Sequence, residues 1–178
     1  KSVSFPTTAA HLKLDNMANE TPDLDFGTGD FTVEGWWYKT STDGTLFSGG
    51  TLGAYDFSYT GNTFRVGRLN RAWDHIFNHT LTNDQWHHIA FVRYNGTIYV
   101  YVNGNSIGEG ANSQDYYSGT PVYIGQNLET SRAFSGKMAD IRVVKSAVYT
   151  ANFSVPTEPL QKIANTVLLT ARADTIID

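Results

Sequence analysis

The chain has 178 residues, a formal net charge of −4 and charged side chains at only 17% of positions. This length suits one domain that buries a full hydrophobic core without the help of disulfides. The chain has no cysteine, so disulfides are excluded. The sparse basic residues argue against nucleic acid as a partner, because clustered Lys and Arg are needed to meet phosphates. No apolar run reaches the roughly 20 residues of a membrane-spanning helix.

Sixteen Gly, ten Tyr and ten Phe favour strands and turns over helices. Alternating or continuous apolar runs between turn residues predict the strands, and no segment has a sustained helical period. We expect loops over 15–30, 40–44 and 105–120, a strand-like stretch near Ile76, and a helical turn over 146–150. In chain order, the predicted strands cover residues 2–5, 12–14, 31–39, 46–48, 55–59, 63–67, 86–93, 96–104, 122–125, 138–145 and 166–170.

The strongest pattern is a hairpin in which the runs 86–93 and 96–104 flank Tyr94, Asn95 and Gly96. Asn and Gly tolerate the positive φ angles of a tight turn. The first run is apolar in both phases, which predicts a strand covered on both faces at the centre of a two-sheet sandwich. The residues expected to be nearly fully buried are Trp86, Ile89, Phe91, Val100, Val122, Ile124, Ile141 and Val143.

The runs Gln85–Arg93, Phe31–Trp36, Val122–Gly125 and Phe134–Val143 occur in this order along the chain. Together they resemble the laminin G-like, concanavalin A-like lectin/glucanase jelly-roll superfamily. The resemblance implies an all-β, two-sheet antiparallel jelly-roll sandwich with very little helix, covering 1–178 as a single domain. It also implies that Val3–Phe5 and Val167–Thr170 are neighbours in one sheet. Because the chain starts at Lys1 and not at Met, we expect it to be part of a longer protein.

The segment from Arg142 to Leu160 is similar to the end of laminin G-like modules in bacteriophage and other virion proteins. This resemblance implies a viral structural or appendage protein, located on a virion surface or otherwise extracellular. One fold hosts many activities, so the function must be argued from a site.

We expect the first of the following three functions, which is not enzymatic, and the other two are its alternatives. The first is a non-catalytic binding or adhesion module, with a glycan or host-surface polysaccharide as partner. The second is an architectural module that contacts other subunits of a capsid, tail or fibre assembly. The third is a glycoside hydrolase, which needs two carboxyl groups facing one substrate. No predicted strand carries acidic residues two positions apart, so this requirement is unmet.

Sugar-binding sites combine aromatic rings, which stack on apolar sugar faces, with Asp, Asn and Arg, which take the hydroxyls. Trp73, Tyr116 and Tyr117 lie in loop-like contexts, where at least one is expected to be exposed. Arg65 and Asp56 share the polar phase of one predicted hairpin, and Arg68 lies near Trp73. The alternative for this set is packing of Arg on aromatic rings at a rim or an oligomer interface.

Structural calcium is the cofactor that the sequence suggests, because hard cations bind carboxylate and loop carbonyl oxygens. Asp25 and Asp30 lie in a turn-rich segment, and Asp140 resembles a calcium-ligating position of some jelly-roll binding modules. The alternative is turn-forming Asp residues and an ion pair between Asp140 and Arg142 or a neighbour. His87 and His88 are adjacent on a predicted strand and therefore point to opposite faces, so we expect core or interface histidines.

Overall fold

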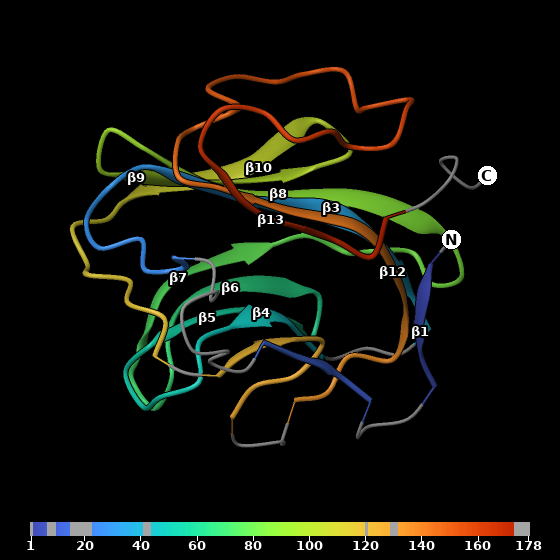
Figure 1. The fold of residues 1–178 in the computed structure, drawn as a ribbon, viewed down its shortest axis with the longest axis horizontal. Helices are drawn as coiled ribbons and strands as arrows, with labels where there is room; N and C mark the ends of the chain where they lie inside the picture. The colour runs from blue at the N-terminus through green and yellow to red at the C-terminus, as the bar shows by residue number, and fades with distance from the viewer. Residues whose placement is uncertain are drawn as a thin grey trace.

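A computed structural model describes residues 2–6, 10–14, 23–40, 44–119, 121–128 and 132–172. These residues form two antiparallel sheets stacked face to face, with strands in the order β1-β12-β3-β8-β9-β10 in one and β2-β11-β4-β5-β6-β7 in the other (Figure 1). The first also contains β13, which pairs with β12. The predicted all-β sandwich is therefore confirmed, and the part of the chain that the structure describes contains no helix.

The strands of the seven-stranded sheet are β1 (Val3–Phe5), β3 (Phe31–Lys39), β8 (Trp86–Tyr94), β9 (Thr97–Val102), β10 (Asn105–Ala111), β12 (Gly136–Val144) and β13 (Thr166–Thr170). Those of the six-stranded sheet are β2 (Leu12–Leu14), β4 (Gly44–Ser48), β5 (Tyr55–Thr60), β6 (Thr63–Arg68), β7 (Trp73–Asn78) and β11 (Val122–Ile124).

The predicted central hairpin is formed by β8 and β9, and β8 is buried on both faces as expected. Its inward residues, Ile89 and Phe91, join the core between the sheets. Its outward residues, Ala90 and Val92, are covered by Ala147, Tyr149 and Phe153 of the segment that follows β12. Figure 1 shows this segment, in orange and red, lying across the outside of the sheet. We call residues 145–165 the covering segment.

Three expectations were wrong. Residues 105–111, predicted as loop, form β10, and the covering segment contains bends over 145–150 in place of a helical turn. Trp86 is only half-buried, unlike the seven other predicted core residues. Side chains alternate along a strand, so Trp86 shares the outward face with His88 and not the inward face with Ile89. It packs edge-on against Tyr38 at the end of the sheet.

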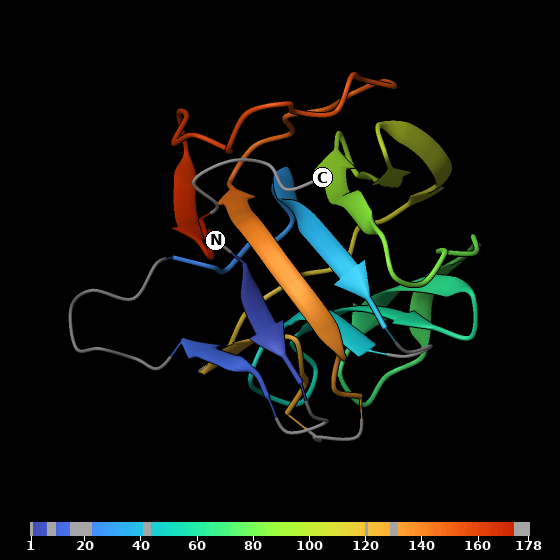
Figure 2. The ribbon, with the colours of Figure 1, turned by 90° about the vertical axis from the view of Figure 1, so that its right-hand side faces the viewer.

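The two terminal strands lie in one sheet, as predicted, but do not pair with each other. Val3–Phe5 pairs with Gly136–Met138, and β13 pairs with residues 141–144. Both therefore use the same edge of β12, one after the other, because its opposite edge is taken by β3. Figure 2 shows β1 and β13 on the same side of β12.

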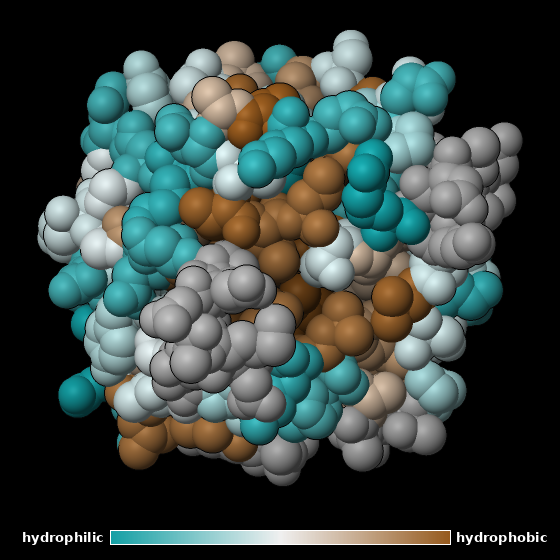
Figure 3. Space-filling view, viewed as in Figure 1, coloured by the Kyte–Doolittle hydropathy of each residue, from teal (hydrophilic) through white to brown (hydrophobic). Residues whose placement is uncertain are grey.

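The core is less completely covered where the edge strands of the two sheets face each other. Half-buried apolar residues pack against it there, and Figure 3 shows apolar surface between the two layers. These residues include Val3, Leu12, Leu14, Val167 and Leu168. A search of the described residues for a helix long and apolar enough to cross a membrane finds none.

Candidate functional site

A row of three paired residues lies beside a hollow on the outer face of the six-stranded sheet. Asp56 on β5 pairs with Gly67 on β6, and Gly67 pairs with Trp73 on β7. Residues paired across neighbouring strands point to the same face of a sheet. The middle member has no side chain, so the Trp73 ring lies over its backbone, and a Cβ at Gly67 would be 3.0 Å from Trp73 Cε3. Asp56 and Trp73 line one pocket on this face, as an acidic and an aromatic wall.

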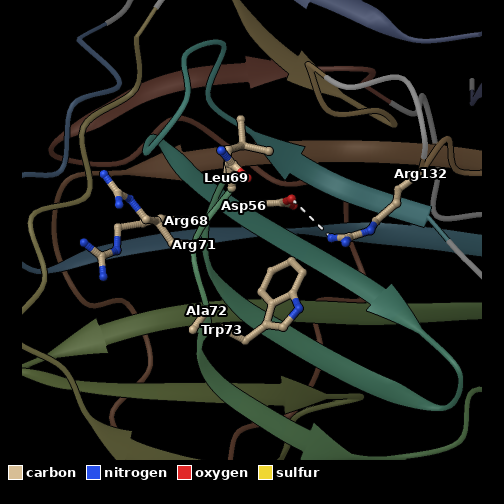
Figure 4. Close-up of a pocket in the computed structure, with 8 residues that line it drawn as sticks. Asp56, Arg68, Leu69, Arg71, Ala72, Trp73 and Arg132 are labelled. Atoms are coloured by element: carbon tan, nitrogen blue, oxygen red, sulfur yellow. Dashed lines mark ion pairs between the residues drawn. The ribbon is translucent and has the colours of Figure 1, made fainter.

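The pocket has a volume of about 340 Å³ and extends over the β6–β7 loop (Figure 4). Asp56, Arg68 and Trp73, three of the predicted ligand-binding residues, line it together with Leu69, Asn70, Arg71, Ala72 and Arg132. In Figure 4, Arg132 approaches Asp56 and the Trp73 ring, while Arg68 and Arg71 lie on the other side of the view. Trp73 is half-buried.

Two ion pairs order the pocket. Arg132 Nη1 lies 3.8 Å from Asp56 Oδ2, and Arg68 Nη2 lies 3.2 Å from Asp74 Oδ1. Asp56 also accepts a hydrogen bond of 2.5 Å from Ser58 Oγ. The Arg132 guanidinium lies 5.0 Å from the centroid of the Trp73 ring and the Arg65 guanidinium lies 5.8 Å from it, which are distances of cation–π contacts. Arg65 thus supports the site from outside the pocket lining.

The two predicted tyrosines have different positions. Tyr117 is 37% exposed and donates a hydrogen bond to Leu52 O, outside the pocket. Tyr116 is completely buried, so among these three aromatic residues it is Tyr117 that confirms the expectation of at least one exposed side chain. Its hydroxyl donates to Asp74 Oδ2 at 2.9 Å, and burial together with the charge of Asp74 raises its pKa. Tyr116 therefore holds Asp74, which in turn holds Arg68.

The candidate calcium ligands have different surroundings. Asp25 accepts hydrogen bonds from Ser118, and Asp30 accepts one of 3.0 Å from the Asn95 amide. Asp140 is buried in β12 at a bulge, with φ +50°, and its amide donates to Ala171 O. Among the described residues, no three His, Cys, Asp or Glu side chains form a group that could hold a metal. Calcium binding stays a prediction.

Backbone carbonyls of the loop that contains Asp25 and Asp30 accept hydrogen bonds from the Arg93 side chain. The buried Arg93 guanidinium donates to Gly27 O at 2.6 Å, to Gly29 O at 2.7 Å and to Gln114 O at 2.7 Å. It also lies 5.2 Å from the ring centroids of Phe31 and Tyr116. Arg93 therefore fastens the loop before β3 to the loop that carries Tyr116, which places Asp74 and Arg68 at the pocket.

The two adjacent histidines are core residues, as expected. His87 Nε2 lies 2.9 Å from Thr82 O. His88 Nε2 lies 3.2 Å from Glu34 Oε2 beneath the covering segment, where Glu34 also binds Arg142 and Tyr149. The predicted alternative of an Asp140–Arg142 pair is not what Arg142 forms, because its guanidinium lies 2.6 Å from Glu34.

The sandwich of two antiparallel sheets is the architecture of jelly-roll domains. The family model described as the concanavalin A-like lectin/glucanases superfamily matches residues 14–152, so the chain belongs to this family. No curated protein sequence matches significantly.

Three solved structures illustrate the shared fold. A candidate carbohydrate binding protein from Bacteroides ovatus has a TM-score of 0.64 and 16% identity, over 90% of this chain and 48% of that one. Domains LG4-5 of the mouse laminin α1 chain have a TM-score of 0.62 and 16% identity, over 88% and 47%. The chain thus spans about half the length of each.

The third is the CBM40 of the Ruminococcus gnavus IT-sialidase, bound to α2,3-sialyllactose. Its TM-score is 0.63 at 11% identity, over 84% of this chain and 92% of that one. The low identities of all three mean that they show the fold alone. The laminin G-like resemblance read from the sequence is confirmed.

Sequence reasoning missed Arg132 and Asp74. Arg132 reaches the pocket because its carbonyl accepts a hydrogen bond from the Thr45 amide, which docks the segment after β11 along β4. Nothing near Arg132 in the sequence indicates that contact. Asp74 could have been predicted from the sequence. It is a carboxylate next to Trp73 and close to two arginines, which is the pattern that singled out the other candidate sugar-binding residues.

Proposed function

We propose that this domain is a non-catalytic carbohydrate-binding module and that the pocket between Asp56 and Trp73 is its ligand site. The observation that carries the proposal is that Asp56 and Trp73, which belong to the row Asp56–Gly67–Trp73, line one pocket as a polar and an aromatic wall. An indole offers an apolar face to a sugar ring, while carboxylate and guanidinium groups take its hydroxyls. The family and the names of two structural neighbours support the same class of ligand.

The roles of the carboxylates favour binding over hydrolysis. Asp56 and Asp74 each form an ion pair with an arginine. Glycoside hydrolysis needs one carboxyl group as an acid and a second as nucleophile or base, both facing the scissile bond. In this pocket both carboxylates hold the arginines in position.

The test is glycan binding, measured on an array and then by calorimetry, for the wild type and two variants. Trp73→Ala should weaken binding at least tenfold, which is about 1.4 kcal/mol. Tyr94→Ala removes another exposed aromatic side chain, at the β8–β9 turn, and should leave affinity unchanged. The melting temperatures of both variants should stay near that of the wild type. Failure of every glycan to bind, or equal losses in both variants, would contradict the proposal.

A protein contact at the same face is the second candidate. Ile76, on the edge strand β7, is 54% exposed. An exposed apolar side chain on a sheet edge favours association with another chain. If the domain is architectural, Ile76→Ser should release it from its assembly and Trp73→Ala should have no effect on glycan retention.

The setting that goes with the proposal is a virion surface or other extracellular surface, in a phage structural or appendage protein. This part rests on the sequence resemblance of residues 142–160. A density map of the parent particle that shows the position of this domain would test it.

A further inference from the structure

Arginine gathers around the pocket. Four of the seven arginines of the chain, Arg65, Arg68, Arg71 and Arg132, line it or contact its Trp73, and no lysine in the described part of the chain lines it. The carboxylates paired with these arginines are Asp56 and Asp74. Counted over the described residues, four positive and two negative groups leave a local excess of two positive charges, on a chain whose net charge is −4. The pocket therefore has the opposite sign to the molecule as a whole.

The charges are also layered by depth. The side chains of Asp56 and Asp74 are 1% and 11% exposed, whereas those of Arg132 and Arg68 are 32% and 26% exposed. Arg71 is exposed. A ligand that enters the pocket therefore meets guanidinium groups first, and the carboxylates lie beneath them.

Arg71 is the group best able to accept a ligand. Within the described part of the chain, its side chain forms no hydrogen bond or ion pair, and its amide donates to Arg68 O in the β6–β7 loop. One nitrogen of Arg68, Nη2, donates a hydrogen bond to Asp74 Oδ1. A guanidinium presents five N–H donors in a planar fork that matches carboxylate and sulfate oxygens. The β6–β7 loop thus carries the unpaired guanidinium of Arg71 close in sequence to Arg68, whose guanidinium is paired in part with Asp74.

We propose that the pocket selects acidic saccharides: a carboxylate or sulfate ester is bound by Arg71 and Arg68 while the sugar ring lies against Trp73. This inference rests on the proposed function and specifies its ligand class. The volume of about 340 Å³ is at the small end of the 300–1,000 Å³ range of ligand pockets, so we expect one acidic residue of a glycan to be bound.

The test compares probes that share a neutral core. Lactose is measured against 3′-sialyllactose, which adds a carboxylate, and 3′-sulfolactose, which adds a sulfate. Polygalacturonate is measured against its methyl ester, in which the carboxylates are neutral. We expect at least one acidic probe to bind tenfold or more tightly than its neutral partner, and the preference to shrink as salt rises. The three acidic arms show which anionic group the pocket accepts.

Two variants with the same charge change locate the preference. Arg71→Gln should reduce acidic-probe affinity at least tenfold. Arg172→Gln removes an exposed arginine next to β13 in the other sheet and should change affinity less than twofold. Because both side chains are exposed, melting temperatures should be unchanged.

Each alternative outcome is distinct. If neutral sugars bind as well as acidic ones and Trp73→Ala abolishes both, the charge inference is wrong and the proposed function stands. If no saccharide binds, both are wrong. If a single-stranded DNA oligonucleotide binds in an Arg71-dependent manner and tighter than every acidic sugar, the pocket is an anion site for another class of ligand and the inference is overturned.

Discussion

Among single residues, Gly67 explains how the Trp73 ring comes to lie at the pocket. A Cβ at this position would lie 3.0 Å from Trp73 Cε3 and 3.1 Å from the Asp74 amide nitrogen. These separations are closer than ordinary van der Waals contact, so the indole would have to shift. Glycine here allows β7 to bring the Trp73 ring against β6, beside Asp56.

Gly67→Ala should therefore impair the site more than the fold. We expect glycan affinity to fall at least threefold, since the displaced ring narrows the pocket, while the free energy of unfolding changes by less than about 1 kcal/mol, the size of the Gly–Ala backbone difference. Calorimetric titration and urea unfolding on the same variant separate the two effects. Unchanged affinity would mean that the hollow beside Gly67 is not where the ligand sits.

Substitution of Arg93 should affect the fold more than the ligand site, because Arg93 supports the site by holding two loops together. Lysine has a compact charge and cannot span carbonyls that lie in several directions. Arg93→Lys should leave at least two carbonyls of the cage unpaired, at roughly 1–2 kcal/mol each, and so cost about 2–4 kcal/mol of stability. Arg172→Lys, at an exposed arginine, is the control, with an expected change within about 0.5 kcal/mol. Denaturant melts of both would refute this role if the two losses were equal.

Some residues of the site could be predicted from the sequence and others could not. Asp56, Arg65, Arg68 and Trp73 were found because hairpin periodicity and a short loop bring them together. Tyr116 was misplaced since a polar, glycine-rich surrounding predicts a surface loop, whereas Arg93 and Asp74 draw the ring inside. Those contacts join residues far apart in the sequence, and no local pattern encodes them.

At the scale of the element, β10 shows why a strand can look like a loop. A Cβ at Gly108 would lie 2.3 Å from Phe77 Cδ1, and one at Gly110 would lie 2.4 Å from His75 Cε1. Glycine is required where side chains of β7 pack on the backbone of β10, and glycine is also the residue that predicts a turn. The tertiary contact thus removes the strand signal, while β8 and β12, rich in apolar residues, keep theirs.

The covering segment is the element that lets β8 be apolar on both faces. Tyr149 and Phe153 stack with ring centroids 3.5 Å apart above the sheet, and Tyr149 donates to Glu34 Oε2 at 2.8 Å. Burial alone would raise the pKa of Glu34, but the hydrogen bond and attraction of His88, the charge of Arg142 and the Tyr149 hydrogen bond outweigh it. The pKa of this carboxyl is therefore lowered.

This shift gives a pH dependence of known sign. A carboxyl with a lowered folded-state pKa contributes stability above its unfolded pKa of about 4.3, and the contribution is lost as pH falls through the folded pKa. Glu34→Gln should cost about 3–5 kcal/mol at pH 7, the usual loss on breaking a buried ion pair. The gap between wild type and variant should narrow below about pH 4. Urea unfolding at both pH values measures it, and a gap that is constant with pH would contradict the assignment.

At the scale of the whole molecule, the two outer faces have different roles. The covering segment closes the face of the seven-stranded sheet over a buried Glu34 network. The six-stranded sheet presents the Trp73 pocket, the proposed ligand site, at the β6–β7 end. The two layers could be predicted from the sequence, because period-two patterns and turns are local features. Which outer face is left uncovered depends on the packing of the covering segment, and that packing is not encoded in a local pattern.

The edge of β12 shows how both ends of the chain complete the sandwich. β1 and β13 occupy successive stretches of this edge, and Leu168 pairs with Val143 and packs against the core. Its neighbour Leu169 pairs with Arg142 and, by the alternation of a strand, points away from the core. The two leucines are both half-buried, so they form a matched pair for measuring what closure of the sheet contributes.

Leu168→Ala should destabilise the domain by about 2 kcal/mol, at the low end for Leu→Ala because the side chain is half-buried, and Leu169→Ala by less than about 1 kcal/mol. Since β13 and β1 extend one sheet around one core, the loss in Leu168→Ala should appear as a single transition shifted to lower denaturant. Tryptophan fluorescence and far-ultraviolet circular dichroism should report the same midpoint. Equal losses in the two variants, or an early separate transition in Leu168→Ala, would show that β13 packs on the sandwich without being part of its cooperative unit.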